Sequence, residues 1–444
     1  QLILPVEARD MTPEQFVASR RPDQPVFIDK VPKKLDFVVE KFLRYKLNYL
    51  FGGGFEEREV APIPPSIPMP SSSDLSRAAE LLRRAERPVL IVGSQSMLLA
   101  HEVDKLAASI TDMGIPTFLS GMARGLLGRN SQYHVRQNRR AALKEADLVI
   151  MAGTVADFRL DYGRVFNKKS KIITVNRSSE QIWKNATFPG AFWKPDVPAV
   201  SDPCHFLLSL HERAGPGRGR FGEWASKLKE SEVIKEEANR KKAAEVACGR
   251  DGTRLVNPLH LVHELEDILP DDSILIGDGG DFVATASYVV RPRGPLRWLD
   301  PGVFGTLGVG GGFALGAKLA RPSAEVWLIW GDGSVGYSVA EFDTFMRHGV
   351  PIIALVGNDA CWTQIEREQI PIFNDNVACP LEYTAYEDVA IGYGGSGSVI
   401  AGPGEDIRGK LKRAQRGAAG ERGSPYLVNV KIGSTNFREG SLSV

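Results

Sequence analysis

Two short polar segments that follow apolar runs contain the residue types best suited to chemistry. The run 326–330 leads directly into Gly331-Asp332-Gly333-Ser334. The two glycines let the backbone approach a ligand closely, and their amides can bind an anion. A carboxylate beside a phosphate is repulsive unless a cation lies between them. Asp332 therefore predicts a magnesium ion that bridges it to a diphosphate.

The second segment offers further oxygen ligands. The run 352–356 ends in Gly357-Asn358-Asp359, whose last two residues lie 26 and 27 positions after Asp332. Parallel sheets bind ligands at the carboxyl ends of their strands, so the two segments are expected to meet there. Either Asn358 or Asp359 could provide another oxygen ligand for the octahedral coordination that magnesium prefers. A glycine turn after a strand is by itself more often structural than functional. The surrounding sequence must therefore show whether this turn binds a ligand.

The elements that must position these segments alternate between strand and helix patterns. Strands are predicted at 273–277, 325–330, 351–356 and 426–430, and helices at 257–269, from Asp281, after the glycine-rich turn 305–312, and at 338–348. Continuous apolar strands between helices indicate a parallel sheet that is covered on both faces. We therefore expect a doubly wound α/β domain over residues 256–444.

A similar α/β series precedes it. Strands are predicted at 88–92, 116–119, 148–151 and 171–175, with helices starting near Ser73 and at 101–113 and 138–146. This pattern predicts a Rossmann-like domain over residues 75–215. The first strand is followed by Gly93-Ser-Gln-Ser-Met97 and not by GxGxxG, which argues against a nucleotide-dependent oxidoreductase.

The remaining segments connect or precede these domains. Residues 1–60 contain one strand-like run, 26–28, and are expected to be the remnant of another domain, since a lone strand cannot fold by itself. Five of the nine residues 62–70 are proline, so 61–74 is expected to be an extended linker. The highly charged stretch 216–255 is expected to be a surface or bridging helical linker.

Composition excludes several classes of protein. The 444 residues suggest about three domains. The net charge of +1 offers no basic field for nucleic acid. Four irregularly spaced cysteines are expected to be free thiols, or at most one pair. No apolar run reaches the ~18 residues of a membrane span, and Gln1 suggests that the N-terminus is cut.

The wider context of Asp332 resembles a known signature. Leu315-Gly316 is followed after five residues by Pro322, after four more by Trp327, and then by residues 328–334. This order is similar to the signature of thiamine-diphosphate-dependent enzymes. Segments similar to the acetolactate-synthase-like branch, and within it to the 2-hydroxyacyl-CoA lyases, are 121–130, 152–159, 294–302 and 356–364. The resemblance implies a pyrimidine-binding domain, a central Rossmann-like domain and a C-terminal diphosphate-binding domain.

The resemblance also implies a set of magnesium ligands. Asp332 would be the first ligand, and the family's usual Asn-Asn pair is replaced here by Asn358-Asp359. We slightly prefer Asp359 as the side-chain ligand, although Asn358 stays possible. The backbone carbonyl of Cys361 would be a further ligand, and its thiol would be incidental.

The same resemblance implies contacts to thiamine diphosphate. Leu307 would prop the cofactor into its bent shape, and the carbonyl of Gly305 would accept a hydrogen bond from the exocyclic nitrogen. A core leucine is the alternative for Leu307. Further residues expected at the cofactor are Gly280, Asp281, Phe282, Gly331, Gly333 and Ser334. Asp281 departs from the amide or histidine often seen in the family.

No residue of this chain matches the glutamate that activates the cofactor in the family. That residue belongs to the N-terminal domain and usually comes from another subunit, so a homodimer or homotetramer is expected. A chain starting at Gln1 is accordingly expected to bind the cofactor weakly and to turn over negligibly.

The resemblance implies a 2-hydroxyacyl-CoA substrate, cleaved to formyl-CoA and an aldehyde one carbon shorter in fatty-acid α-oxidation. Arg124, Arg159 and Arg177 near strand ends are candidate contacts for CoA phosphates, with ordinary surface or ion-paired roles as the alternative. In acetolactate synthases the central domain holds FAD, which nothing here demands.

Two other functions stay open: an acetolactate-type carboligase, and a non-catalytic binding or regulatory protein. Relatives of this type are held at the endoplasmic reticulum membrane by an N-terminal segment, which would lie upstream of Gln1.

Overall fold

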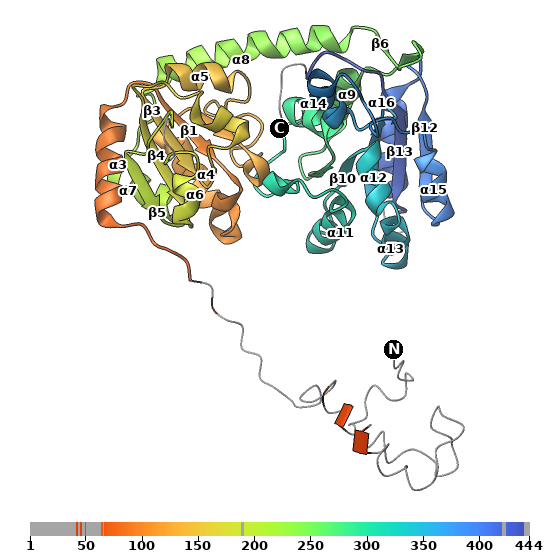
Figure 1. Ribbon diagram of the computed structural model, residues 1–444, viewed down its shortest axis with the longest axis horizontal. Helices are drawn as coiled ribbons and strands as arrows, with labels where there is room; N and C mark the ends of the chain where they lie inside the picture. Colours follow the sequence, from red (N-terminus) through yellow and green to blue (C-terminus); the bar gives the residue numbers. More distant parts are fainter. Residues whose placement is uncertain are drawn as a thin grey trace. The chain divides into compact units, whose positions relative to one another are not determined.

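The computed structural model describes residues 66–187, 191–419 and 423–438, with Pro64 and, between 41 and 49, Lys41, Phe42, Tyr45, Lys46 and Tyr49. The chain divides into two units, Gln1–Ser66 and Ile67–Val444. The strand predicted at 26–28 lies outside the described residues. The second unit contains both predicted α/β domains (Figure 1).

The central domain is built on a five-stranded parallel sheet. Its strands are β1 (Pro88–Val92), β2 (Thr117–Leu119), β3 (Leu148–Ala152), β4 (Lys171–Asn176) and β5 (Val197–Val200), in the order β2-β1-β3-β4-β5. From β1 the chain adds β2 on one side and then β3, β4 and β5 on the other side, as in a doubly wound sheet. The predicted parallel α/β architecture is therefore confirmed, while β5 was not predicted because its run contains a proline and only four residues.

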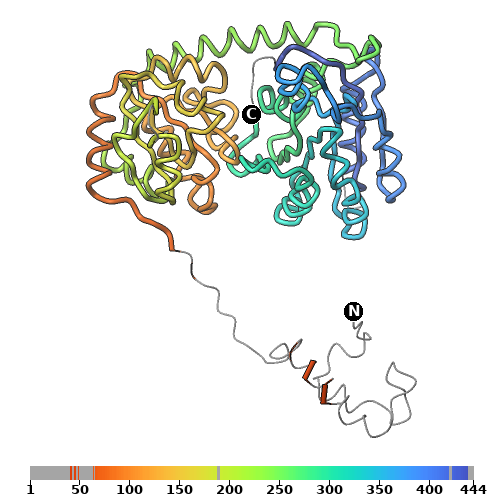
Figure 2. The backbone as a smooth tube through the Cα atoms, in the orientation of Figure 1, coloured from red at the N-terminus to blue at the C-terminus, as the bar shows by residue number. Residues whose placement is uncertain are grey.

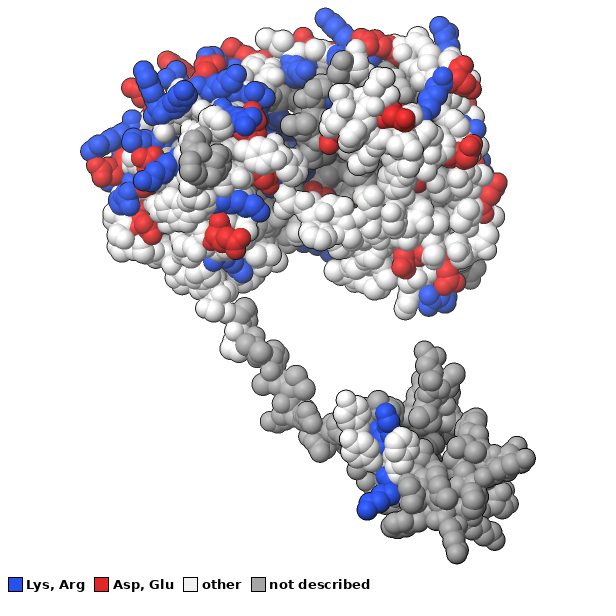
Figure 3. Space-filling model, in the orientation of Figure 1, with Lys and Arg blue, Asp and Glu red and all other residues white. Residues whose placement is uncertain are grey.

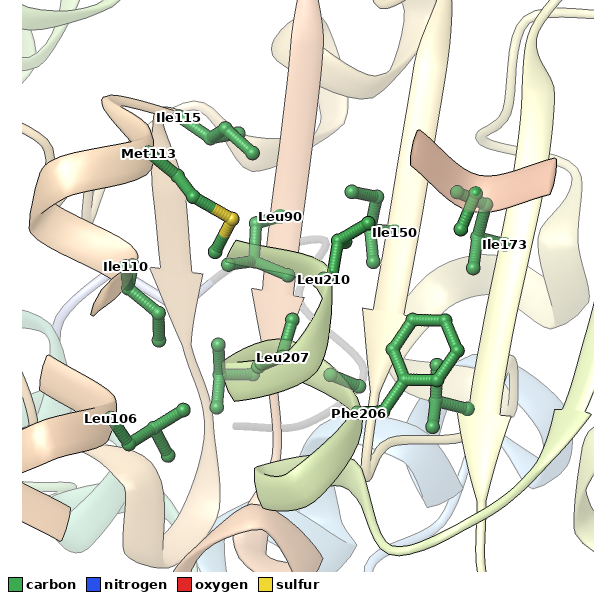
Figure 4. Packing of buried hydrophobic residues seen from close by; sticks show 14 of the residues in the cluster. Leu90, Leu106, Ile110, Met113, Ile115, Ile150, Ile173, Phe206, Leu207 and Leu210 are labelled. Carbon is green, nitrogen blue, oxygen red and sulfur yellow. The ribbon is translucent and has the colours of Figure 1, made fainter. Parts of the chain in front are cut away.

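Helices cover both faces of this sheet. They are α3 (Ser72–Arg84), α4 (Val103–Met113), α5 (Arg139–Glu145), α6 (Ser179–Trp183) and α7 (Pro203–Ala214), with 3-10 turns η2 (Ser94–Met97), η3 (Ala100–Glu102), η4 (Gly121–Ala123) and η5 (Phe158–Gly163). On one face, Leu106 and Ile110 of α4 and Phe206 of α7 pack against Leu90 and Ile150 of the sheet (Figure 4). Burial of this apolar surface stabilises the domain.

The charged stretch after the central domain forms one long helix, α8 (Gly222–Ala243), which connects the two sheet domains (Figure 2). The indole of Trp224 at its start donates to the carbonyl of Pro88 at 3.0 Å. At its end, Asn257 donates to the carbonyl of Lys242 at 2.9 Å. The helix is therefore a bridge, and few of its residues are buried because each end packs on a different domain.

The C-terminal domain is built on a six-stranded parallel sheet. Its strands are β8 (Ile274–Asp278), β9 (Trp298–Leu299), β10 (Val326–Gly331), β11 (Ile353–Asn358), β12 (Ser396–Ile400) and β13 (Tyr426–Lys431), in the order β12-β13-β11-β10-β8-β9. A two-stranded ribbon of β6 (Ala247–Cys248) and β7 (Arg254–Leu255) precedes it. Strands β10 and β11 lie inside the sheet, which places both chemical segments at its centre.

The helices of this domain are α9 (Pro258–Ile268), α10 (Asp281–Val289), α11 (Gly310–Ala320), α12 (Asp332–Ser338), α13 (Glu341–Arg347), α14 (Thr363–Phe373), α15 (Tyr386–Gly392) and α16 (Ile407–Ala418), with the 3-10 turn η6 (Gly302–Phe304). The helix predicted at 338–348 is confirmed as α13, which starts three residues later, whereas the separate helix α12 was not predicted. The chain already turns helical at Asp332, because the small residues 333, 334 and 336 allow the strand to pass directly into a short helix.

All four cysteines are free, as predicted. Among the described residues, no helix combines the length and apolar character that crossing a bilayer requires.

Candidate functional site

The two chemical segments lie side by side at the carboxyl ends of β10 and β11. The strands are parallel neighbours, and Gly331 pairs in register with Gly357. Asp332 therefore follows β10 at the level where Asn358 ends β11. The sheet thus brings together the residues that the sequence predicted to share one site.

Asp332 is buried at the start of α12 and is held by backbone amides. Its Oδ1 accepts from the amide of Gly333 at 2.8 Å, and its Oδ2 accepts from the amide of Cys361 at 3.0 Å. Burial raises the pKa of Asp332 to about 6, against the lowering effect of these hydrogen bonds. A bound cation would favour the ionised form.

Asp359 faces the same space as Asp332. Its Oδ2 accepts from the hydroxyl of Thr363 at 2.6 Å. Burial, and then the negative charge of Asp332, raise the pKa of Asp359 to about 8. Two buried carboxylates that repel each other are an arrangement that a divalent cation stabilises.

Asn358 is turned to other partners. Its amide donates to the carbonyl of Thr384 at 3.2 Å and to Oδ1 of Asn429 at 3.3 Å, and its oxygen accepts from the amide of Ala360 at 3.3 Å. The geometry accordingly favours Asp359 over Asn358 as the partner of Asp332, although the ligand assignment stays a prediction.

The donor set fits magnesium only if oxygens from other sources join it. Within residues 66–187, 191–419 and 423–438, no three His, Cys, Asp or Glu side chains are grouped to hold a metal. The two carboxylates would need the carbonyl of Cys361 and diphosphate oxygens, as the sequence implied. Burial raises the pKa of the Cys361 thiol to about 12, so that group is neutral, and it contacts Arg250 and Glu366.

A small pocket of about 40 Å³ lies beside the carboxylates, and glycines make up much of its lining. It is formed by the starts of α10, α12 and α14, and includes Gly280, Asp281, Phe282, Gly331, Asp332, Gly333, Ser334, Asp359 and Trp362. The residues predicted at the cofactor thus lie around this pocket, except Gly305, which lines a different cavity, and Leu307. A Cβ at Gly333 would lie 2.4 Å from the ring of Trp362, so only glycine fits there. Helix starts provide free amides for an anion.

The carboxylate of Asp281 is neutralised by arginines. Arg367 of α14 forms an ion pair with it at 2.6 Å, and Nε of Arg438 lies 3.7 Å away. Burial raises the pKa of Asp281, and the two arginines oppose that shift. The departure from the family at this position therefore leaves no unopposed negative charge at the start of α10.

Leu307 lies in the loop between η6 and α11 and is half-buried. It belongs to none of the buried clusters of the two domains. This position leaves part of the side chain accessible, and it differs from the core leucine considered as the alternative. Gly305, in the same loop, has a φ of 67°, a conformation that favours glycine.

Sequence reasoning missed Asp278, the last residue of β8. It is fully buried and its carboxylate accepts from the amides of Gly308 and Gly310 and from the indole of Trp330. The strand was predicted to end at Gly277, one residue too early. An acidic residue directly after a third parallel strand was the signal that could have revealed it.

A second space lies between the central domain and α10. Two cavities of about 420 and 230 Å³ share Arg124, Arg139 and Arg159 among their lining residues. The structure thus brings together two of the three arginines proposed for CoA phosphates, although Arg159 forms an ion pair with Asp157 at 2.8 Å, which matches its alternative role. Arg177 lies elsewhere and forms an ion pair with the buried Asp202 at 2.7 Å, which matches its alternative role.

Two of the lining arginines, Arg124 and Arg139, are half-buried, and the charges of Asp300 and Asp157 respectively favour their protonated forms. Arg124 donates to the carbonyl of Ser287 at 3.1 Å and lies over the ring of Trp298, and Arg139 donates to the carbonyl of Arg159 at 2.9 Å. In the described part of the chain neither forms an ion pair with a carboxylate. Burial lowers the pKa of Arg124 to about 10 and lowers that of Arg139. Such a site favours an anionic ligand.

The comparisons with known proteins agree with this geometry. The family model for the central domain of thiamine pyrophosphate enzymes matches residues 75–210. The model for their C-terminal TPP-binding domain, where TPP is another name for thiamine diphosphate, matches residues 278–430.

Individual relatives give the same family. The 2-hydroxyacyl-CoA lyase 2 of Danio rerio is 52% identical over 408 residues, which are 92% of this chain and 64% of that protein. Its namesake in Homo sapiens is 49% identical over 417 residues, 94% of this chain and 64% of that protein. A probable acetolactate synthase of Mycobacterium bovis is 32% identical over 367 residues, 82% of this chain and 63% of that protein.

The chain thus spans a little under two thirds of the length of these relatives. Both matched regions coincide with the two parallel-sheet domains of the structure. The chain belongs to the thiamine pyrophosphate enzymes, of which it contains the central domain and the C-terminal TPP-binding domain.

Proposed function

We propose that the protein is a lyase, dependent on thiamine diphosphate and magnesium, that cleaves 2-hydroxyacyl-CoA to formyl-CoA and an aldehyde one carbon shorter. This reaction would be a step of fatty-acid α-oxidation. The observation that supports a CoA substrate is the cavity lined by Arg124, Arg139 and Arg159. Relatives named 2-hydroxyacyl-CoA lyase 2, about half identical to this chain, support the reaction.

Residues of the C-terminal domain would hold the cofactor. Asp332, Asp359 and the carbonyl of Cys361 would bind magnesium, and the amides at the starts of α10 and α12 would bind the diphosphate. Leu307 and Gly305 would contact the rings. When bound, thiamine diphosphate supplies a carbon nucleophile and an electron sink for the carbonyl carbon of the substrate.

The central domain would hold the nucleotide part of CoA. Phosphates would bind Arg124 and Arg139, neither of which forms an ion pair with a carboxylate in the described part of the chain. Gly279, Val283 and Gly305 line the smaller of the two cavities together with these arginines, so a thioester fixed there would point toward the cofactor loop. Positioning of this kind lowers the barrier by removing the entropy cost of the encounter.

In the proposed reaction the bond between the thioester carbonyl carbon and C2 breaks. The C2 hydroxyl loses its proton and becomes the aldehyde, and the former carbonyl carbon gains a proton and leaves as formyl-CoA. No further reactant is needed. In the family, a glutamate of the N-terminal domain activates the cofactor, and we propose that this domain of a partner subunit supplies it.

An apolar surface of the C-terminal domain supports assembly into a homodimer or homotetramer. Figure 3 shows a broad area of that domain with few charged side chains. Strongly exposed apolar residues include Phe304, at 91% exposure, and Ile372 and Phe373, both at 72%. We propose that these residues belong to an interface, since exposed apolar patches mark interaction sites. Phe304 lies next to Gly305, so a partner bound there would reach the cofactor loop.

The test is an assay of the full-length protein with thiamine diphosphate and magnesium. With a 2-hydroxyacyl-CoA we expect equal amounts of formyl-CoA and the shortened aldehyde, and with pyruvate we expect no acetolactate. Acetolactate from pyruvate would support the carboligase alternative, which the mycobacterial relative favours. Turnover of neither substrate by a protein that binds the cofactor would support a binding or regulatory role.

We also propose that the full-length protein is held at the endoplasmic reticulum membrane by a segment outside this chain. Fractionation of cells that express the full-length protein tests this, and recovery of all of it in the supernatant after carbonate extraction would contradict it.

A further inference from the structure

Both carboxylate oxygens of Asp278 accept hydrogen bonds from other groups of the protein. Its Oδ2 accepts from the amide of Gly310 at 2.8 Å, from the amide of Gly308 at 3.1 Å and from the indole of Trp330 at 3.1 Å. Its side chain has no exposed surface. In the described part of the chain no arginine, lysine or histidine acts on this carboxylate. Dipoles alone therefore stabilise the charge, and burial raises the pKa.

One side of this network is the loop that contains Leu307. Gly308 has a φ of 88°, and a Cβ at Gly310 would lie 2.7 Å from the Cβ of Asp278. The backbone that follows Leu307 thus approaches Asp278 through the amides of Gly308 and Gly310, and at Gly310 only glycine leaves room for that approach. The loop reaches its position because its amides bind this carboxylate.

The other side of the network is the diphosphate pocket. Trp330 is the penultimate residue of β10 and directly precedes Gly331 and Asp332. Ser334 of α12 donates its hydroxyl to the backbone carbonyl of Asp278 at 2.5 Å. The same residue therefore contacts the element that lines the diphosphate pocket and the loop that presents Leu307.

We propose that Asp278 is a positioning residue that fixes the distance between Leu307 and the diphosphate pocket, so that the rings and the diphosphate of one cofactor can be bound at once. This proposal rests on the proposed function. It assigns Asp278 no contact with the cofactor and no part in the proton transfers. Its loss would therefore affect binding of the rings more than binding of the diphosphate.

The experiment compares two ligands, thiamine diphosphate and inorganic pyrophosphate, each titrated with magnesium by calorimetry into the full chain. Wild type, Asp278→Asn, Leu307→Ala and the double variant are measured. For Asp278→Asn we expect thiamine diphosphate to bind about tenfold more weakly and pyrophosphate to bind within about threefold of wild type. The double variant should bind no more weakly than Leu307→Ala, since the two residues act as one unit.

The matched control is Asp147→Asn in the central domain. Asp147 also accepts from two backbone amides, those of Glu86 at 2.8 Å and Arg87 at 3.0 Å, but lies outside the described site. We expect Asp147→Asn to have the same ratio of affinities for thiamine diphosphate and pyrophosphate as the wild type. An equal loss of both ligands in Asp278→Asn, or additive losses in the double variant, would overturn the proposal.

Hydrogen exchange of the wild type tests the same idea if Asp278→Asn does not fold. The amides of Gly308 and Gly310 should exchange slowly without ligand, and rapid exchange of both would overturn the proposal. A wild type that binds neither ligand would instead contradict the cofactor assignment of the proposed function. The two failures are therefore distinguishable.

Discussion

Asp332 and Asp359 are buried carboxylates with raised pKa values, about 6 and about 8. Without metal, the folded chain therefore holds more protons than the unfolded chain between about pH 4 and pH 8. The free energy of unfolding falls as pH rises through this window, because the unfolded carboxylates ionise first. Magnesium binding requires the ionised forms and becomes more favourable over the same range.

Thermal unfolding without magnesium checks this prediction. We expect the melting temperature to fall between about pH 5.5 and pH 8 through these two groups. In Asp359→Asn the fall should be smaller, because one raised carboxylate is removed. Magnesium with pyrophosphate should stabilise the wild type more at the upper pH. A wild type whose melting temperature rises steadily across the window would contradict the assignment.

The unpaired arginines predict the anion affinity of the second space. Replacing Arg124 or Arg139 by Gln removes a half-buried cation that forms no ion pair among the described residues, so binding of adenosine 3′,5′-bisphosphate should weaken about tenfold. Arg347→Gln is the control, since Arg347 is exposed and pairs with Asp343 of its own helix. Calorimetry measures the affinity. Unchanged affinity in both cavity variants would show that the nucleotide binds elsewhere.

At the scale of elements, α10 connects the two spaces. Its first residues line the diphosphate pocket. The carbonyls of its last turn accept from the central domain: Arg124 donates to Ser287, Gln137 to Tyr288 at 3.1 Å, and Arg136 to Val289 at 3.0 Å. Helix ends otherwise leave such carbonyls without partners. Cations at the C-terminal end also interact favourably with the helix dipole.

Arg136→Met should weaken this connection. The change removes the donor that Arg136 provides to the carbonyl of Val289 and to the carboxylate of Glu236, each at a cost of about 1–3 kcal/mol. We expect a lower melting temperature and pyrophosphate binding reduced about threefold, because the start of α10 is less firmly placed. Arg140→Met is the control, since Arg140 is exposed and pairs with Asp161 at the surface. Wild-type stability in Arg136→Met would contradict this role of α10.

How much of the structure could be predicted follows from the kind of signal that each element leaves in the sequence. The buried parallel strands were predictable because they are continuous apolar runs. The ends of β10 and β11 then indicated that Asp332 and Asp359 lie close together. Helix α14 was not predicted, since none of its residues is buried, its apolar side chains are exposed and it contains a proline. The contacts of Asp278 and the ion pair of Arg177 join residues distant in sequence, and no local pattern encodes them.

At the scale of the whole molecule, the exposed apolar residues of the C-terminal domain predict association. Phe373→Glu places a charge on the surface at the end of α14, where 72% of the native residue is exposed. If this surface is an interface, the charge must be desolvated on association, so the dimer should dissociate at higher concentration than wild type. Sedimentation analysis measures the distribution of species.

The control for this variant is Leu98→Glu in the central domain. Leu98 is also an exposed apolar residue, at 54%, but it lies outside the apolar surface of the C-terminal domain. We expect Leu98→Glu to associate as the wild type does. An unchanged distribution of species in Phe373→Glu would place the interface elsewhere.

The order of strands in the C-terminal sheet has a consequence for synthesis of the protein. Strand β13 comes last in the chain, at Tyr426–Lys431, yet it lies between β12 and β11. A nascent chain therefore has β11, which leads to Asp359, at an open edge until residue 431 has left the ribosome. The cofactor pocket can reach its final form only after translation has passed β13, and a transcript ending before β13 would yield a product with two unpaired, aggregation-prone edges.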